Sequence, residues 1–270
     1  MSPTDADDFL ALHTPGDPLL LPNAWDVGSA RLLASMGFRA LATTSSGHAA
    51  SLGRLDGEVA RDEALAHAVQ LGDASGLPVN ADLANCFADE PDGVAETIRL
   101  AAEAGIAAAS VEDVSGDEDR PIYDLGLSVD RVRAAVEAAH AGPGRLVLVA
   151  RADNWFHGIE DLDDTIRRLQ AYQEAGADVL YAPGPSDTSD LRSIVESVDR
   201  PVNVLARPGV PPVAELARLG VARISVGGSF AFAAYGALVE AATELRDDGT
   251  FGYASRSAVG GQAVRDAFTT

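Results

Sequence analysis

Short apolar segments rich in β-branched residues alternate along the chain with longer, amphipathic segments rich in alanine. The longer segments place apolar residues three and four positions apart and end at glycine, as helices do, and clear examples are 93–105, 129–142 and 162–176. The short segments have the length and composition of strands. This regular alternation predicts βαβ units and a parallel sheet.

Eight strand–helix pairs can be counted, with strands predicted at 19–26, 40–46, 78–84, 107–114, 146–153, 179–184, 201–206 and 223–228. Eight such units predict a (β/α)8 TIM-type barrel, which commonly uses about 250 residues as one domain. An open doubly wound sheet often carries a glycine-rich fingerprint after its first strand, and no G-x-G-x-x-G occurs there. We therefore predict one barrel domain over residues 1–270, with its core at about 19–248.

Two segments lie outside this core. A short helix is expected at 6–13, before the first strand, and a tail is expected at 249–270. The last helix, at 229–249, is long and apolar on several faces, which indicates that it packs against more than its own barrel. We expect the protein to be a homo-oligomer.

Charge and composition exclude several classes of function. The net charge of −21 disfavours nucleic-acid and anionic-membrane partners, and no apolar run is long enough to span a bilayer. The acidic N-terminus lacks the pattern of a signal peptide, so a cytoplasmic location is expected. All 20 basic residues are arginine, which rules out a lysine Schiff base and hence class I aldolase or pyridoxal-phosphate chemistry.

Polar residues gather where the first five predicted strands end, which is the active-site face of a parallel barrel. Asp82 and Glu112, with Asp56 in a loop, are hard oxygen donors that suit Mg²⁺ or Mn²⁺. Arg151 follows the apolar run LVLVA and is interpreted as a clamp for a substrate carboxylate or phosphate, or as a structural partner of Glu112. The step from Ser46 to Gly47 could present backbone N–H groups to an oxyanion.

The later strands supply fewer polar groups. Their strand ends include Asn203 and a turn formed by Gly227, Gly228 and Ser229. Because this turn precedes a helix, a different kind of barrel could use it to bind a phosphate group. A phosphate-binding barrel is therefore an alternative interpretation of this turn.

Several ordered motifs resemble the isocitrate lyase and phosphoenolpyruvate mutase superfamily over nearly the whole chain. They are LPNAWDVGSARLLASMGF at 21–38, TTSSGHAASLGRLDG at 43–57, VNADLANCF at 79–87, AASVED at 108–113 and LVARADN at 148–154. The resemblance implies that Ser46, Gly47 and Arg151 hold the carboxylate or oxo group of a 2-oxo acid. It implies a homotetramer in which the last helices are exchanged between subunits.

The resemblance also implies a bound Mg²⁺, held mostly through water by Asp56, Asp82 and Glu112, which stabilises a metal-bound enolate. Asn80 belongs to the same candidate metal set, and Trp25, Ser45 and Asn203 are further candidates for contact with substrate. Asn80 stands where the family's lyases carry aspartate, so weaker metal affinity is expected.

A second departure is the loop at 115–124, which lacks the lysine and catalytic cysteine of the lyases' gating loop. Arg120 can supply positive charge there but cannot act as a general acid or base. Without these groups, true isocitrate lyase activity is not expected. His48 and Tyr123 are candidate proton donors, and Cys86 is interpreted as a bystander because no activating neighbour is evident.

The sequence therefore predicts a Mg²⁺-dependent lyase that acts on a small 2-oxo dicarboxylate through an enolate. Oxaloacetate-type decarboxylation needs no base to begin, because loss of CO₂ itself forms the enolate, and P–C bond cleavage would use the same site. The alternative is a 2-oxo-acid binding protein of the same superfamily with little or no turnover.

Overall fold

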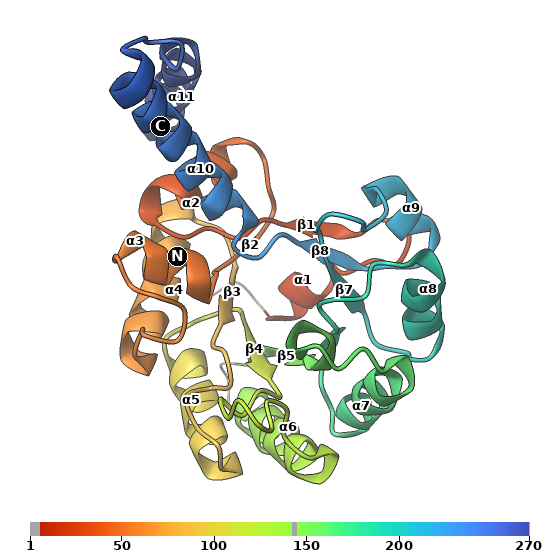
Figure 1. The fold of residues 1–270 in the computed structure, drawn as a ribbon. Coiled ribbons are helices and arrows are strands. Elements are labelled where there is room, and N and C mark those ends of the chain that lie inside the picture. The colour runs from red at the N-terminus through yellow and green to blue at the C-terminus, as the bar shows by residue number, and fades with distance from the viewer. Residues whose placement is uncertain (1–5, 142–144, 270) are drawn as a thin grey trace.

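A computed structural model describes residues 6–141 and 145–269, so the outermost residues of the expected domain and Gly142 to Gly144 lie outside the described residues. Its centre is one sheet of eight parallel strands in the order β1-β8-β7-β6-β5-β4-β3-β2 (Figure 1). The strands are β1 (Leu19–Leu21), β2 (Leu41–Ala42), β3 (Val79–Asp82), β4 (Ala108–Glu112), β5 (Val147–Arg151), β6 (Val179–Tyr181), β7 (Val202–Leu205) and β8 (Arg223–Ser225).

The first and second strands close the sheet into a barrel. Asn23 forms a parallel bridge with Ala42, and the backbone N–H of Ala42 donates to the carbonyl of Pro22 at 3.0 Å. The predicted (β/α)8 TIM-type barrel is confirmed, with every strand inside its expected segment.

Helices surround the strands, and every connection between consecutive strands contains at least one helix, as in βα units. They are α1 (Ala6–Leu10), α2 (Val27–Ser35), α3 (Ser45–Ser51), α4 (Arg61–Ser75), α5 (Pro91–Glu103), α6 (Leu125–Ala139), the 3₁₀ helix η1 (Asn154–His157), α7 (Leu162–Glu174), α8 (Thr188–Glu196), α9 (Val213–Arg218), α10 (Ser229–Thr243), the π-helical turn η2 (Glu244–Asp248) and α11 (Ala254–Phe268). None of the helices in the described part of the chain combines the length and the apolar character needed to span a bilayer.

The start of α3 corrects the sequence analysis. Ser45 and Ser46 were predicted as the end of the second strand, but β2 ends at Ala42 and both serines begin a helix. The reason is local: the Oγ1 atom of Thr44 accepts from the backbone N–H of Gly47 at 3.3 Å and caps the helix. The turn therefore brings the two serines to the rim of the barrel.

Apolar cores on both sides of the strands hold the barrel together. Inside the strands, Phe9 from α1 is fully buried among small and β-branched residues and fills the N-terminal end of the barrel. A larger core lies between the strands and the helices, and includes Leu71, Ile98 and Leu169. Because the N-terminal end is filled, the end of the barrel that can hold a site is the C-terminal end of the strands.

The C-terminal segment projects away from the barrel as an arm formed by α10, η2 and α11 (Figure 1). The expected tail at 249–270 thus contains the helix α11, whose Phe268 lies under the guanidinium of Arg31 from α2. Only Ala231 of α10 is buried, while large apolar side chains such as Leu238 and Val239 are each 63% exposed. An apolar arm of this kind is an unpartnered surface.

Candidate active site

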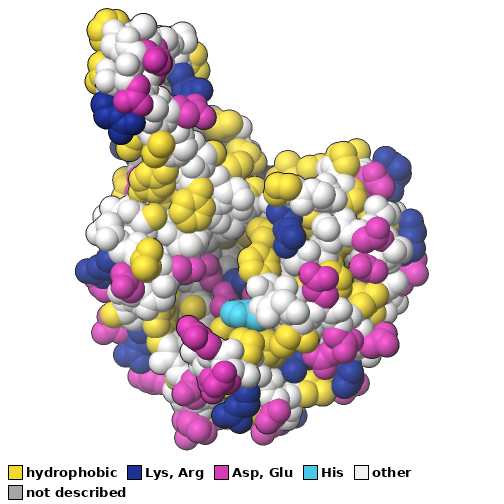
Figure 2. All heavy atoms as spheres, in the orientation of Figure 1, with side chains coloured by type: hydrophobic (Ala, Val, Ile, Leu, Met, Phe, Trp, Pro, Cys, Tyr) yellow, Lys and Arg dark blue, Asp and Glu magenta, His cyan; other side chains and the backbone are white. Residues whose placement is uncertain are grey.

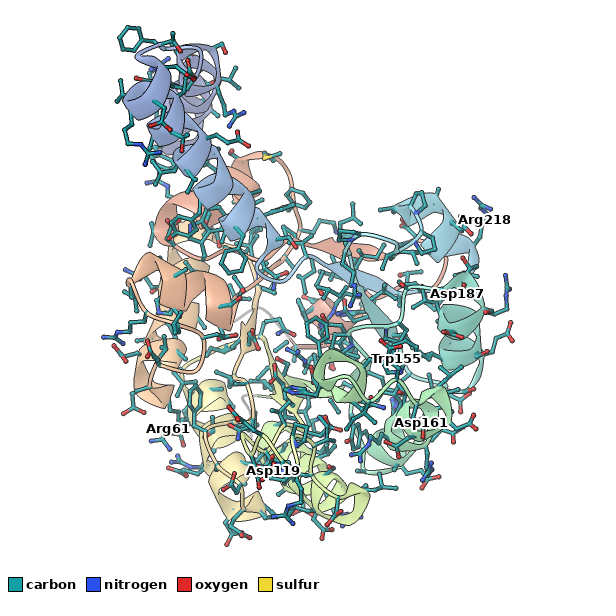
Figure 3. The ribbon with its side chains drawn as sticks, viewed as in Figure 1. Arg61, Asp119, Trp155, Asp161, Asp187 and Arg218 are labelled. Atoms are coloured by element: carbon teal, nitrogen blue, oxygen red, sulfur yellow. The ribbon has the colours of Figure 1, made fainter. Side chains whose placement is uncertain are left out.

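A cavity of 660 Å³ opens at the C-terminal ends of the strands (Figure 2). Groups from every strand or the loop after it reach this hollow. Figure 3 shows Trp155 of η1 nearer the middle of the barrel than Arg61 of α4 and Arg218 of α9, which lie on the outer helices. Of the predicted site residues, the lining contains Ser45, Ser46, Asp56, Asn80, Asp82, Glu112 and Arg151. The structure therefore brings residues from widely separated motifs together.

Arg151 is the centre of a charged cluster in this cavity. Its guanidinium contacts Glu112 at 2.6 Å, Asp153 at 2.7 Å and Asp82 at 3.4 Å. The arginine also stacks over the ring of Tyr181, with 4.9 Å from the guanidinium carbon to the ring centroid. The salt bridge to Glu112 that the sequence left open is present in this structure.

Negative charge exceeds positive charge in the cluster. Burial raises the pKa of Glu112 well above its usual value despite the nearby Arg151, and Asp153, Asp82 and Asp56 raise it further. Repulsion among these carboxylates means that one arginine does not neutralise them all. The cluster therefore carries excess negative charge, which a bound divalent cation would offset.

A second, fully buried polar layer supports the cluster from behind. Asp113 accepts from the backbone N–H of Asp153 at 2.9 Å, from the hydroxyl of Tyr172 at 2.6 Å and from Arg168 at 3.1 Å. These bonds connect the end of β4 with the end of β5 and with α7. Glu112 and Arg151 are thus held by neighbours whose own positions are fixed.

The loop after β3 is strained and tied down by Arg131. Ala84, Cys86 and Phe87 have φ values of 49°, 60° and 58°, in the left-handed region that disfavours such residues. The guanidinium of Arg131 donates to the backbone carbonyls of this loop, to Asn85 at 2.8 Å, to Asp89 at 2.6 Å and to Ala88. The loop directly follows Asp82, so these bonds hold the carboxylate of Asp82 in place.

Ser45 and Gly47 have different positions on α3. The backbone N–H of Ser45 donates to Asp82 at 3.0 Å, which joins the helix to the acidic cluster. A Cβ at Gly47 would lie 3.1 Å from Trp25 and 3.1 Å from Ala231 of α10, so glycine is required for packing. Gly47 and Trp25 both lie behind the cavity wall rather than in the lining described for it.

The two candidate proton donors also lie outside this cavity. The hydroxyl of Tyr123 donates to Asp89 over a separate depression beside the 115–124 loop. The imidazole of His48 stacks on that of His67, with ring centroids 3.5 Å apart, against a smaller neighbouring hollow. Cys86 is fully buried, and burial raises its pKa to about 12, so the predicted bystander is an inert thiol in this structure.

The buried histidines predict acid sensitivity. Burial lowers the pKa of His67 to about 4 and that of His13 to about 3. Below about pH 6.5 the unfolded chain takes up protons that the folded protein does not, so the free energy of unfolding falls as pH drops, by about 1.4 kcal/mol per unit for each histidine. Because buried carboxyls with raised pKa values, such as Glu112, act in the opposite direction, urea unfolding at pH 7.5 and 5.5 should compare the wild type with His67→Gln to isolate this loss. His67→Gln should lose roughly half of it, and an unchanged pH dependence in that variant would contradict the assignment.

Several cavity residues were given no role in the interpretation of the sequence, among them Asp153, His157, Tyr181 and Arg223. Burial raises the pKa of the Tyr181 hydroxyl, whereas burial and the nearby Arg151 lower the pKa of Arg223 to about 10. Arg223 crosses the barrel and donates to the Oδ1 of Asn80 at 3.1 Å. A charged residue within an apolar strand segment is the sequence pattern that marked Arg151 as a site residue. Arg223 has the same pattern, but it was not selected.

The donor set fits a divalent cation held largely through water. Within the described ranges, no three His, Cys, Asp or Glu side chains approach closely enough to bind a metal ion by themselves. Asp56, Asp82 and Glu112 nevertheless face the same cavity with oxygen donors only, as Mg²⁺ or Mn²⁺ prefers, and such ions keep several water ligands. Asn80 is already bonded to Arg223, so its amide oxygen is engaged.

The family follows from a comparison with known proteins. Residues 9–246 match the family model described as phosphoenolpyruvate phosphomutase. The chain belongs to the isocitrate lyase and phosphoenolpyruvate mutase superfamily. A superfamily member from Burkholderia cenocepacia, described as a lyase/mutase, has a solved structure that is 52% identical, with a TM-score of 0.93 and coverage of 98% of this chain and 95% of that one.

Relatives within the superfamily include lyases as well as a protein without a described activity. An uncharacterised protein of Mycobacterium tuberculosis is 35% identical, with 81% of each chain covered. The oxaloacetate decarboxylase of Pseudomonas aeruginosa is 32% identical over 84% of this chain and 79% of its own. The 2-methylisocitrate lyase of Salmonella typhimurium is 30% identical over 89% of this chain and 88% of its own. Superfamily members of similar length thus cleave carbon–carbon bonds of small organic acids.

Proposed function

We propose that this protein is a divalent-cation-dependent lyase that decarboxylates a small 2-oxo dicarboxylate of the oxaloacetate type. The observation that carries the proposal is the cavity itself, where a carboxylate cluster around Arg151 shares the lining with a further buried arginine, Arg223. The activity named for the Pseudomonas aeruginosa relative supports the choice of reaction.

Asp56, Asp82 and Glu112 would hold Mg²⁺ or Mn²⁺, mostly through water. When bound, the cation would polarise the 2-oxo group and stabilise the negative charge that develops on its oxygen. Arg151 is placed to take the adjacent substrate carboxylate in a bidentate manner, which requires it to exchange part of its contact with Glu112 for the substrate. The hydroxyls of Ser45 and Ser46 line the same wall.

Bond cleavage in this reaction needs no base. The bond between C3 and its carboxylate breaks, its electron pair forms the enolate, and CO₂ leaves. One proton must then reach C3 to give the monocarboxylic 2-oxo acid. His157 and Tyr181 line the cavity and can donate that proton, whereas His48 and Tyr123 lie outside it.

Pyruvate release from oxaloacetate, measured with Mg²⁺ and then with EDTA, tests the proposal. Because metal ions in solution also promote this decarboxylation, Glu112→Gln at the same protein and metal concentrations is the matched control. We expect turnover that exceeds this control and is abolished by EDTA. Turnover that is indifferent to EDTA would contradict the proposal.

A binding function is the second candidate, and two observations favour it. Asn80 replaces a carboxylate and is engaged by Arg223, and the loop at 115–124 has neither lysine nor cysteine. Tight binding of oxaloacetate or 2-oxoglutarate in calorimetry, without turnover across a panel of 2-oxo acids, would establish this alternative in place of the lyase.

We also propose that the arm joins subunits into a homotetramer, as the family resemblance implies. The exposed apolar side chains of α10, Leu238 and Val239 among them, support this proposal. Light scattering of the wild type should give a mass of about four chains, and a double change of Leu238→Glu and Val239→Glu should lower it, because charge is poorly tolerated in an apolar interface. Met36→Glu, an exposed apolar position on the barrel, should leave the mass unchanged. A monomeric wild type would contradict the proposal.

A further inference from the structure

Arg223 is a buried cation that lacks an anionic partner. Its side chain lines the cavity from β8, yet the residue is only 2% exposed. Its one hydrogen bond in the described part of the chain is to the neutral amide of Asn80, and its Nε–H has no acceptor there. Burying an unpaired charge is costly, so the position calls for a compensating anion.

The other buried arginine of the cavity is already compensated. Arg151 contacts three carboxylates, whereas among the described residues no carboxylate forms an ion pair with Arg223. Strand register places the two arginines in one row, Arg151–Tyr181–Asn203–Arg223, across β5 to β8. The row therefore runs from an arginine paired with three carboxylates to one that has no anionic partner among the described residues.

The row between the two arginines also contains a second incompletely satisfied polar side chain, that of Asn203. The amide nitrogen of Asn203 donates to the Oγ of Ser225 at 3.0 Å, but its buried Oδ1 has no partner among the described residues. Asn203 and Arg223 are thus two unsatisfied polar groups on adjacent strands. A ligand whose far end carries an anion would satisfy the arginine.

We propose that Arg223 binds the distal carboxylate of the substrate and so selects dicarboxylic over monocarboxylic 2-oxo acids. The inference rests on the proposed function, in which the 2-oxo end lies at Arg151 and the metal-side carboxylates. It also gives a reason for Asn80: an aspartate 3.1 Å from Arg223 would neutralise the arginine internally, whereas an amide leaves its charge for the ligand.

Matched ligands isolate the distal carboxylate. Oxaloacetate and 2-oxobutyrate have four carbons each, 2-oxoglutarate and 2-oxovalerate have five, and in each pair only the first carries a second carboxylate. Dissociation constants of all four, measured by calorimetry with Mg²⁺ present, give a preference ratio for each chain length. Arg223→Met should reduce the ratio for the better-fitting length about a hundredfold, mainly by weakening the dicarboxylate.

Two further variants keep the test decisive. Asn80→Asp should raise the melting temperature, because the new carboxylate pairs with the buried arginine, and it should also reduce the preference ratio. A gain in metal affinity would strengthen both ligands of a pair and would therefore leave the ratio unchanged. Arg207→Met removes an exposed arginine from the rim of the same cavity and should change the ratio less than threefold.

The outcomes separate the two proposals. If the wild type binds 2-oxo acids but Arg223→Met and Asn80→Asp keep its preference, the assignment of Arg223 is overturned while the proposed function stands. If only Arg207→Met loses the preference, the distal carboxylate binds at the rim of the cavity instead, and the assignment of Arg223 is again overturned. A wild type that binds none of the four ligands would overturn both proposals.

Discussion

Arg151→Met is expected to lower kcat/KM for the proposed decarboxylation by about a thousandfold, as loss of a charge-stabilising donor in a buried site does. The same change leaves Glu112, Asp82 and Asp153 facing one another without their shared cation. Because uncompensated buried charges are strongly destabilising, the free energy of unfolding should fall by about 3–5 kcal/mol. Steady-state kinetics and urea unfolding measure the two effects.

The two effects of Arg151 can be separated with matched variants. Arg151→Lys keeps the charge but loses the planar fork, so it should recover much of the stability while activity stays low. Arg61→Met removes a partly exposed arginine whose one ion pair within the described residues is with the neighbouring Asp62, and should change stability by no more than about 0.5 kcal/mol. Full activity in Arg151→Met would refute the role assigned to this residue.

Arg131→Met should lower the free energy of unfolding by about 4 kcal/mol. Arg131 is 1% exposed, its guanidinium donates to three backbone carbonyls of the loop after β3, and it stacks over Tyr123 at 4.3 Å. Removing it leaves buried carbonyls without donors, at a cost of roughly 1–3 kcal/mol each that partial relaxation reduces. The strained backbone at Ala84 and Cys86 would then lose its main tether.

Activity should fall together with stability in Arg131→Met, because the freed loop begins at the residue after Asp82. Hydrogen exchange should show faster exchange at 83–90 than elsewhere on that side of the barrel. Arg133→Met lies on the same helix with an exposed side chain and should leave both quantities nearly unchanged. Unchanged hydrogen exchange at 83–90 in Arg131→Met would show that packing, and not these hydrogen bonds, maintains the strained conformation of the loop.

The barrel could be predicted because its determinants are periodic and local. Apolar strands near Leu146 and Val179 and helices that end at glycine recur in one order, and the polar strand ends at Asp82 and Glu112 face the active-site end in any parallel barrel. The start of α3 was missed because its cap depends on the side chain of Thr44, which also suits a strand.

The site was predicted less completely, since distance along the sequence does not indicate contact. Arg223 reaches Asn80 across 143 positions, and no local pattern marks that pair. His48 and Tyr123 were chosen for their chemistry, but the fold turns one toward His67 and the other toward Asp89. Gly47 matched a motif, and the structure adds that Trp25 and Ala231 exclude any larger side chain there.

What the sequence alone determined is the architecture and the kind of chemistry available: a barrel without lysine, polar at its first five strand ends, with an arginine inside its fifth strand. Only the tertiary structure decided how charges are paired. Arg151 is neutralised by three carboxylates while Arg223 is left with an amide, because pairing depends on which inward side chains meet across the barrel. Periodicity fixes which face a residue takes, but long-range packing fixes which partner it finds.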